Sequence, residues 1–148
     1  MTIYQQLKAR VQLVRDWGPL PKVRLNDSED VYRLLRDEVF CWDRERLLSI
    51  MLNSRNQVIA IEEVSVGSLT ASIVHPREVF KSAILANAHS IILVHNHASG
   101  DPRPSSDDRN ITETINTAGQ FLNIHLLDHL IIANDSYTCW SQDWQINY

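Results

Sequence analysis

The chain has 148 residues, 44% of them hydrophobic and 22% charged, with a formal net charge of -4. This length predicts a single domain that can bury a hydrophobic core without help from disulfides or metals. The negative charge argues against a general nucleic-acid-binding protein, although a small basic patch stays compatible with it. No apolar run approaches the roughly 20 residues that a membrane span needs, and the amino terminus has no signal-peptide pattern, so we expect no membrane partner.

The two cysteines, Cys41 and Cys139, lie far apart in the sequence and form no Cys-x-x-Cys pair. This usage predicts a reduced, cytoplasmic protein rather than a disulfide-stabilised secreted one. The simplest interpretation of both cysteines is a small buried hydrophobic side chain.

Residues 1–43 are expected to form an N-terminal helical extension without a chemical motif. Apolar residues recur every three to four positions over 2–17 and predict an amphipathic helix: Ile3, Leu7, Val11 and Val14. After a linker at 19–25, helix-capping residues at 26–28 and a second apolar face predict another helix that reaches about residue 42. The extension would serve as a packing cap, a dimer surface or an arm for a partner, which leaves homo-oligomerisation open.

Residues 44–148 alternate predicted strands with predicted helices. The expected strands are 46–52, 58–66, 90–94, 124–127, 130–133 and 137–140, with a break at Asp128-His129. The expected helices begin at Pro76 and at Ser105. This alternation predicts a three-layer α/β domain with a mixed sheet flanked by helices.

The apolar strand 90–94 runs directly into His95 and His97. Side chains at i and i+2 of a strand point to the same face, so both imidazoles can converge at the strand end. A short loop rich in glycine and proline then leads to Ser105 and Asp108, at the start of the last long helix. Two histidines and one carboxylate predict a three-ligand zinc site with its fourth position open.

The same residues also have a purely structural interpretation. Ser105-x-x-Asp108 fits a helix capping box, and a single His-x-His is a weak signal of metal binding. Capping and metal binding are compatible, because a cap can aim the Asp108 carboxylate. Asp128-His129 is either a neighbour of the metal that orients a ligand or a structural turn.

The pattern His95-x-His97 followed by Ser105-x-x-Asp108 resembles the JAMM signature of the JAB/MPN metalloprotease superfamily. The fuller string at 95–105, with His75-Pro76-Arg77-Glu78-Val79-Phe80 before it and Leu127-Asp128-His129-Leu130-Ile131-Ile132 after it, resembles the bacterial RadC-like branch. The resemblance covers about residues 45–140. It implies a JAB/MPN fold, related to the cytidine-deaminase-like architecture, for a domain that we place at 44–148.

The resemblance also implies roles for individual residues. A zinc ion, Zn2+, would be held by His95, His97 and Asp108, with water as the fourth ligand. Ser105 would help to stabilise the tetrahedral intermediate of amide hydrolysis.

The superfamily uses a glutamate on the first strand of the sheet as general base. Counting back from the turn at 52–56, which resembles that of the family, places this glutamate at Glu45. Glu63 is the alternative, because its strand could also face the site.

The implied function is a zinc metallopeptidase that hydrolyses a peptide or isopeptide bond in a peptide or protein substrate. Two alternatives stay open: a DNA-repair-associated accessory protein, and a non-catalytic interaction module on the same fold. An acidic chain without a basic stripe gives the DNA alternative little support.

Overall fold

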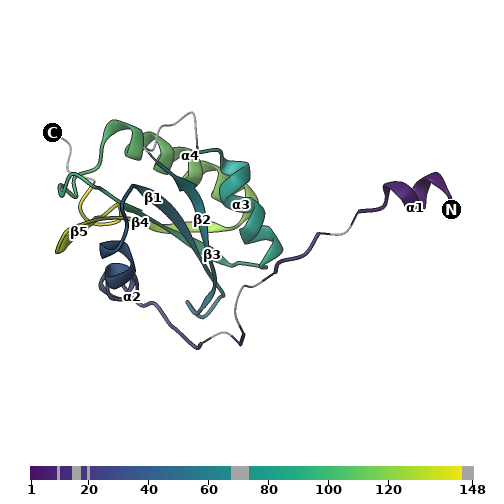
Figure 1. Ribbon diagram of the computed structural model, residues 1–148, viewed down its shortest axis with the longest axis horizontal. Helices are drawn as coiled ribbons and strands as arrows, with labels where there is room; N and C mark the ends of the chain where they lie inside the picture. The colour runs from purple at the N-terminus through teal and green to yellow at the C-terminus, as the bar shows by residue number, and fades with distance from the viewer. Residues whose placement is uncertain (10, 15–17, 20, 68–73, 145–148) are drawn as a thin grey trace.

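Figure 1 shows a computed structural model of the chain, which describes residues 1–9, 11–14, 18–19, 21–67 and 74–144. The elements in chain order are α1 (Ile3–Leu7), α2 (Ser28–Phe40), β1 (Arg46–Leu52), β2 (Val58–Val66), α3 (Pro76–Leu85), β3 (Ser90–Asn96), α4 (Ser106–Leu122), β4 (His125–Ala133) and β5 (Ser136–Cys139). Among the described helices, none is long and apolar enough to cross a membrane.

The strands form one five-stranded sheet in the order β2-β1-β3-β4-β5. β3 and β4 run parallel, whereas the other neighbouring pairs are antiparallel, so the predicted mixed sheet is confirmed. β3 lies at the centre and is buried at every position. Its unbroken apolar run is typical of a strand that is covered on both faces.

Helices cover both faces of the sheet: α3 and α4 lie on one side and α2 lies on the other (Figure 1). On the α4 side the core includes Leu47, Met51, Phe80, Leu93 and Ile115. On the α2 side it includes Leu35, Ile50, Val94, Leu130 and Ile132. The predicted three-layer α/β architecture is therefore confirmed.

The predicted helix over residues 2–17 is wrong beyond Leu7. α1 is only five residues long, and residues 8–9 and 11–14 are not helical; residues 10 and 15–17 lie outside the described part of the chain. The apolar side chains Ile3, Leu7, Val11 and Val14 remain 73–77% exposed, and Figure 1 shows α1 away from the sheet. An isolated helix of this length is marginal in water unless its apolar face is buried.

The predicted break between two strands at Asp128-His129 is also wrong, because β4 runs without interruption through both residues. The pairing with β3 shifts between Ile91, opposite Leu126, and Ile92, opposite Asp128. Leu127 is the extra residue of this bulge and is 43% exposed. A bulge changes which residues face the core, and this change of phase in the sequence pattern resembled a break.

Candidate metal centre

The end of β3 directs His95 toward the α4 side of the sheet. His95 pairs with Leu47 across the β1–β3 ladder, and Leu47 packs in the α4-side core. Since side chains alternate along a strand, Leu93 and His95 share this face. His97 follows the last residue of the strand and is held by a hydrogen bond from its N–H to the carbonyl of Ile132, 3.0 Å away.

The start of α4 brings Asp108 to the same place. The Ser105 hydroxyl accepts from the N–H of Asp108 at 3.1 Å, and the N–H of Ser105 donates to Oδ2 of Asp108 at 2.7 Å. These reciprocal bonds form a capping box, so the cap holds the Asp108 side chain in one orientation. The carboxylate is buried, with 1% of its side chain exposed.

The structure brings His95, His97 and Asp108 together as a group that could hold a metal ion. One potential ligand atom from each lies within 4.8 Å of the others. Nδ1 of His95 is 3.3 Å from Oδ1 of Asp108, and Nε2 of His97 is 3.1 Å from Oδ2. Two imidazoles and one carboxylate are a donor set that suits a catalytic zinc ion with one open position.

The hydrogen bonds of His97 indicate that its pair with Asp108 accommodates a positive charge. Nδ1 lies 2.8 Å from the carbonyl oxygen of Asp101, which only accepts, so Nδ1 donates the proton in that contact. In the neutral ring, Nε2 would then turn a lone pair toward the Asp108 carboxylate. A proton or a metal cation between the two atoms removes this conflict.

The electrostatics of the pair agree with this geometry. Burial by itself would lower the pKa of His97, but the hydrogen bonds to Asp108 and to the Asp101 carbonyl outweigh it and raise that pKa above its ordinary value. Burial by itself would raise the pKa of Asp108, but the two imidazoles and the Ser105 N–H hold it well below its usual range. Asp108 is therefore an anion near neutral pH, as a metal ligand must be.

His95 supplies a second sign that the cluster is incomplete by itself. Within the described part of the chain, neither of its ring nitrogens makes a hydrogen bond, although the side chain is only 1% exposed. A buried polar atom without a hydrogen bond calls for an explanation, and a bound ion is one. The residues present thus fit a metal ion.

The two candidate general bases lie on opposite faces of the sheet. Oε2 of Glu45 lies 3.6 Å from Nε2 of His95, and the Glu45 side chain is 28% exposed. Glu63 pairs in register with Leu48, which packs in the α2-side core. Its carboxylate forms an ion pair with the Arg46 guanidinium at 2.7 Å.

The loop between the histidines and α4 is held in a tight conformation. Gly100 has a φ of +84°, and a Cβ at this position would lie 2.5 Å from the side-chain nitrogen of Asn134. The positive φ favours glycine here, whereas the exposed Asn134 side chain could move away from a Cβ. Asp101 accepts from the backbone N–H of Arg103 at 3.0 Å, and the Arg103 guanidinium lowers the pKa of Asp101 to about 2. The Asp101 carbonyl is thereby kept in place to orient His97.

Thr112 and His129 form a buried hydrogen-bonded pair next to Asp108. The sequence analysis did not single out Thr112. The Thr112 hydroxyl donates to the Asp108 carbonyl at 2.6 Å, so it accepts from Nδ1 of His129 at 2.7 Å. Thr112 lies one helical turn after Asp108, and this i+4 spacing is the signal that could have found it. Nε2 of His129 has no partner among the described residues.

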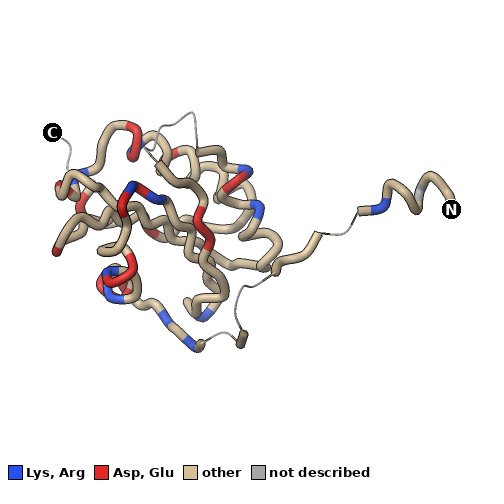
Figure 2. Tube along the Cα trace, viewed as in Figure 1, with Lys and Arg blue, Asp and Glu red and all other residues tan. Residues whose placement is uncertain are grey.

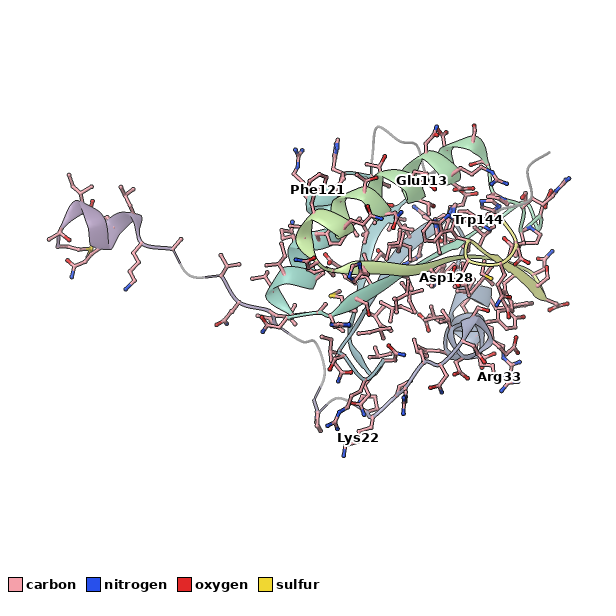
Figure 3. All side chains as sticks on the ribbon, turned by 180° about the vertical axis from the view of Figure 1, so that it is seen from behind. Lys22, Arg33, Glu113, Phe121, Asp128 and Trp144 are labelled. Carbon is pink, nitrogen blue, oxygen red and sulfur yellow. The ribbon has the colours of Figure 1, made fainter. Side chains whose placement is uncertain are left out.

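Asp128 lies within β4 and binds the C-terminal turn, and it is not part of the metal cluster. Its carboxylate accepts from the N–H of His129 at 2.9 Å and from the N–H and hydroxyl of Ser141 at 3.0 and 2.9 Å. These bonds fix the C-terminal turn that carries Trp144 onto the His129 ring, 4.9 Å away; Figure 3 labels Asp128 and Trp144 in this part of the molecule.

A cavity of about 290 Å³ adjoins the cluster on the His97 side. Its other lining residues come from the end of α2, the loop that follows it, and the ends of β3 and β4: Val39, Phe40, Trp42, Asp43, Asn96, Ala98, Ile132 and Asn134. Of the three proposed ligands only His97 lines this cavity, and Val39 and Ile132 belong to the α2-side core, so most of the cavity lies on the face opposite His95.

Among the residues that the structure describes, lysine and arginine do not gather in one basic stripe along the chain. Figure 2 shows Lys and Arg spread along the described chain and interleaved with Asp and Glu, for example along α2. Nucleic-acid-binding proteins instead cluster basic residues on one face.

Comparison with known proteins assigns the family. The family model of the RadC-like JAB domain matches residues 25–145, a stretch that also includes α2. A UPF0758 protein of Desulfitobacterium hafniense is 44% identical over 135 residues, which cover 89% of this chain and 60% of the relative. The UPF0758 protein of Methanosarcina mazei is 45% identical over 117 residues, covering 79% of this chain and 51% of the relative.

A UPF0758 protein of Caldanaerobacter subterraneus is 54% identical over 110 residues, covering 74% of this chain and 47% of the relative. The chain thus spans 47% to 60% of the length of these three relatives. Their shared name states no activity. The match over most of the chain, together with the mixed sheet flanked by helices, leads to one assignment: the chain belongs to the family of RadC-like JAB domains.

Proposed function

We propose that this domain is a zinc-dependent hydrolase that cleaves a peptide or isopeptide bond in a peptide or protein substrate. One observation carries the proposal: a buried His95-His97-Asp108 cluster lies beside a half-buried glutamate, with 3.6 Å between Glu45 Oε2 and His95 Nε2. A carboxylate next to a three-ligand site can act as the base in metal-assisted hydrolysis.

When bound, zinc would supply Lewis acidity, which makes hydroxide available near neutral pH and polarises a carbonyl oxygen. His95, His97 and Asp108 would hold the ion and leave one position open. The capping box and the Asp101 carbonyl keep Asp108 and His97 in the orientations that this requires. Rigid support of this kind limits the reorganisation needed during the reaction.

Glu45 would act as general base. Its carboxylate would take the proton of the attacking water and pass it to the amine that leaves, which conserves protons over one cycle. The Arg46 guanidinium does not compete for this carboxylate, because it is paired with Glu63. Ser105, at the start of α4, would donate a hydrogen bond from its hydroxyl to the oxyanion that forms on the substrate carbonyl.

The first test is metal content. We expect about one zinc ion per chain in the purified protein, and His97→Ala or Asp108→Ala should lower that content to near zero, as measured by elemental analysis. His125→Ala is the matched control, because His125 is exposed at the start of β4, and it should keep its zinc. Unchanged zinc content in the His97 and Asp108 variants would refute the site.

The second test separates the two glutamates. Glu45→Gln should keep its zinc but lose about 10²–10⁴-fold in the rate of hydrolysis of a peptide library, because it removes the general base. Glu63→Gln should retain activity, since Glu63 lies on the other face of the sheet. If Glu63→Gln were the inactive variant, the base would have to be reassigned. A wild-type protein that holds zinc but cleaves nothing in the library would favour an interaction module.

A further inference from the structure

Asn96 lies between the two histidines in the sequence, and its side chain binds the backbone instead of the metal cluster. It is 6% exposed. Its Oδ1 accepts from the N–H of Arg46 at 2.7 Å, and its Nδ2 donates to the carbonyl of Arg44 at 3.1 Å. One side-chain amide thus binds both peptide groups that flank Glu45.

These two bonds continue the β1–β3 ladder beyond its last backbone pair. That pair joins Leu47 to His95, and the main chain of Asn96 pairs instead with Ile132 of β4. Residues 44–46 therefore have no strand partner on the β3 side, and the Asn96 side chain provides the missing donor and acceptor. On the opposite side, the N–H of Gly67 donates to the Glu45 carbonyl at 2.8 Å.

We infer that Asn96 is a positioning residue, which sets the Glu45 carboxylate relative to the histidines. Holding the peptide groups on both sides of a residue fixes its φ and ψ, and hence the direction of its Cα–Cβ bond. The segment His95-Asn96-His97 thus carries two proposed metal ligands and also the clamp on the proposed base. The consequence for catalysis rests on the proposed function, whereas the clamp itself does not.

The clamp is tested on the metal-free protein by amide hydrogen exchange. Asn96→Ala should speed exchange of the Arg46 N–H by about tenfold, because the acceptor is removed. A crystal structure of this variant should show the Glu45 carboxylate farther than the present 3.6 Å from Nε2 of His95. Unchanged exchange and an unmoved Glu45 would overturn the inference.

Asn53 provides the matched control at the other end of β1. Its Oδ1 accepts from the backbone N–H groups of Arg55 and Gln57 at 2.9 and 3.0 Å, so Asn53→Ala also removes two bonds from a side-chain amide to the backbone. It should leave exchange at Arg46 unchanged. Faster exchange at Arg46 in both variants would indicate general loosening of β1 and would overturn a specific clamp.

Asn96→Asp is a second, more conservative variant, which keeps the test valid if Asn96→Ala does not fold. It keeps the acceptor for Arg46, but it turns a second carboxylate oxygen toward the Arg44 carbonyl in place of the donor. We expect protection at Arg46 within about threefold of wild type, with Glu45 displaced through the Arg44 side. A Glu45 position identical to wild type would show that the bond to Arg44 does not position it.

The catalytic consequence has a distinct signature. Zinc affinity of Asn96→Ala, measured by competition with a chelator, should stay within about threefold of wild type, while kcat falls at least tenfold and KM changes little. In a Glu45→Gln background the same substitution should cause no further loss, because both act through one group. Additive losses would overturn the positioning role. Absence of hydrolysis by wild type would refute the proposed function and leave the exchange test of the clamp intact.

Discussion

The two faces of the sheet are formed by the same strands but bury different kinds of side chains. On the α2 side, Ile50, Val94 and Leu130 are buried among apolar neighbours from α2. On the α4 side, the same strands carry His95 and His129 into contact with the polar side chains of α4. Both faces stabilise the fold by burying hydrocarbon, but only the α4 face also carries this group of buried polar side chains, with their energetic penalty.

The buried polar groups of the α4 face lie around the candidate metal cluster. Asp108, Thr112 and His129 are 1%, 0% and 0% exposed, and Nε2 of His129 has no partner among the described residues. A core selected only for stability would replace such groups by apolar ones. These polar groups lie next to the cluster that we propose to hold zinc, and the apolar cores on both faces offset their energetic penalty.

The largest effect is expected on the α2 face. Leu130→Ala should lower the free energy of unfolding by about 2–5 kcal/mol, because a fully buried leucine leaves a cavity. Urea denaturation would measure this loss. Zinc content should stay at the wild-type level under native conditions.

Ile61 gives the control for this substitution. It lies on β2 opposite Ile50, but it is 44% exposed. Ile61→Ala should lower the free energy of unfolding by clearly less than Leu130→Ala does. Equal losses of stability in the two variants would contradict the greater role that we assign to the buried Leu130. Loss of zinc from Leu130→Ala would show that the α2 face also affects the metal cluster.

An intermediate effect is expected from pH on the α4 face. Burial, helped by the charge of His95, lowers the pKa of His129 to about 3 from its ordinary value of 6.5. The unfolded chain therefore binds this proton more readily, so the stabilisation is complete above pH 6.5 and is lost as the pH falls toward 3. His129→Gln removes this dependence and keeps a donor for Thr112.

The measurement is the free energy of unfolding of the metal-free protein between pH 7 and about pH 4. The slope should be shallower in His129→Gln than in wild type, by up to about 1 kcal/mol per pH unit. Leu130→Ala should shift the whole curve down without changing its slope. Parallel curves for wild type and His129→Gln would show that His129 does not titrate between the folded and unfolded states.

The smallest effect compares the two helix caps. Ser105 caps α4, and Asp27 caps α2 by accepting from the N–H of Asp30 at 2.9 Å. Replacing either by alanine should lower the free energy of unfolding by about 1 kcal/mol, measured by urea denaturation. Only Ser105→Ala should also slow hydrolysis. If Asp27→Ala slowed it equally, the serine would act through helix stability alone.

Local patterns in the sequence were enough to find the residues of the candidate cluster and the strands and helices of the body of the domain, apart from the continuity of β4. The spacing of His95 and His97 on a strand, and of Ser105 and Asp108 at a helix start, follows from periods of a few residues. Such short-range geometry needs no knowledge of the rest of the fold. Their convergence in the structure comes from the loop between them, whose Gly100 conformation is equally local.

Local sequence patterns could not predict contacts between segments that are distant along the chain. The apolar repeat at 2–17 predicted a helix, but a repeat cannot tell whether any surface is available to bury it. The pattern in β4 changed phase at Leu127, and only the register against β3 identifies a bulge there. The clamp of Asn96 joins it to Arg46 and Arg44, which lie 50 and 52 residues earlier in the sequence.

The sequence by itself determined the α/β class, the mixed sheet, and the identity of the side chains that meet at the end of β3. Only the tertiary structure decided which glutamate shares their face, because Glu45 and Glu63 differ in strand register and not in chemistry. Register depends on pairing between segments that are distant along the chain. The pairing between strands therefore sets the position of the proposed general base relative to the candidate metal cluster.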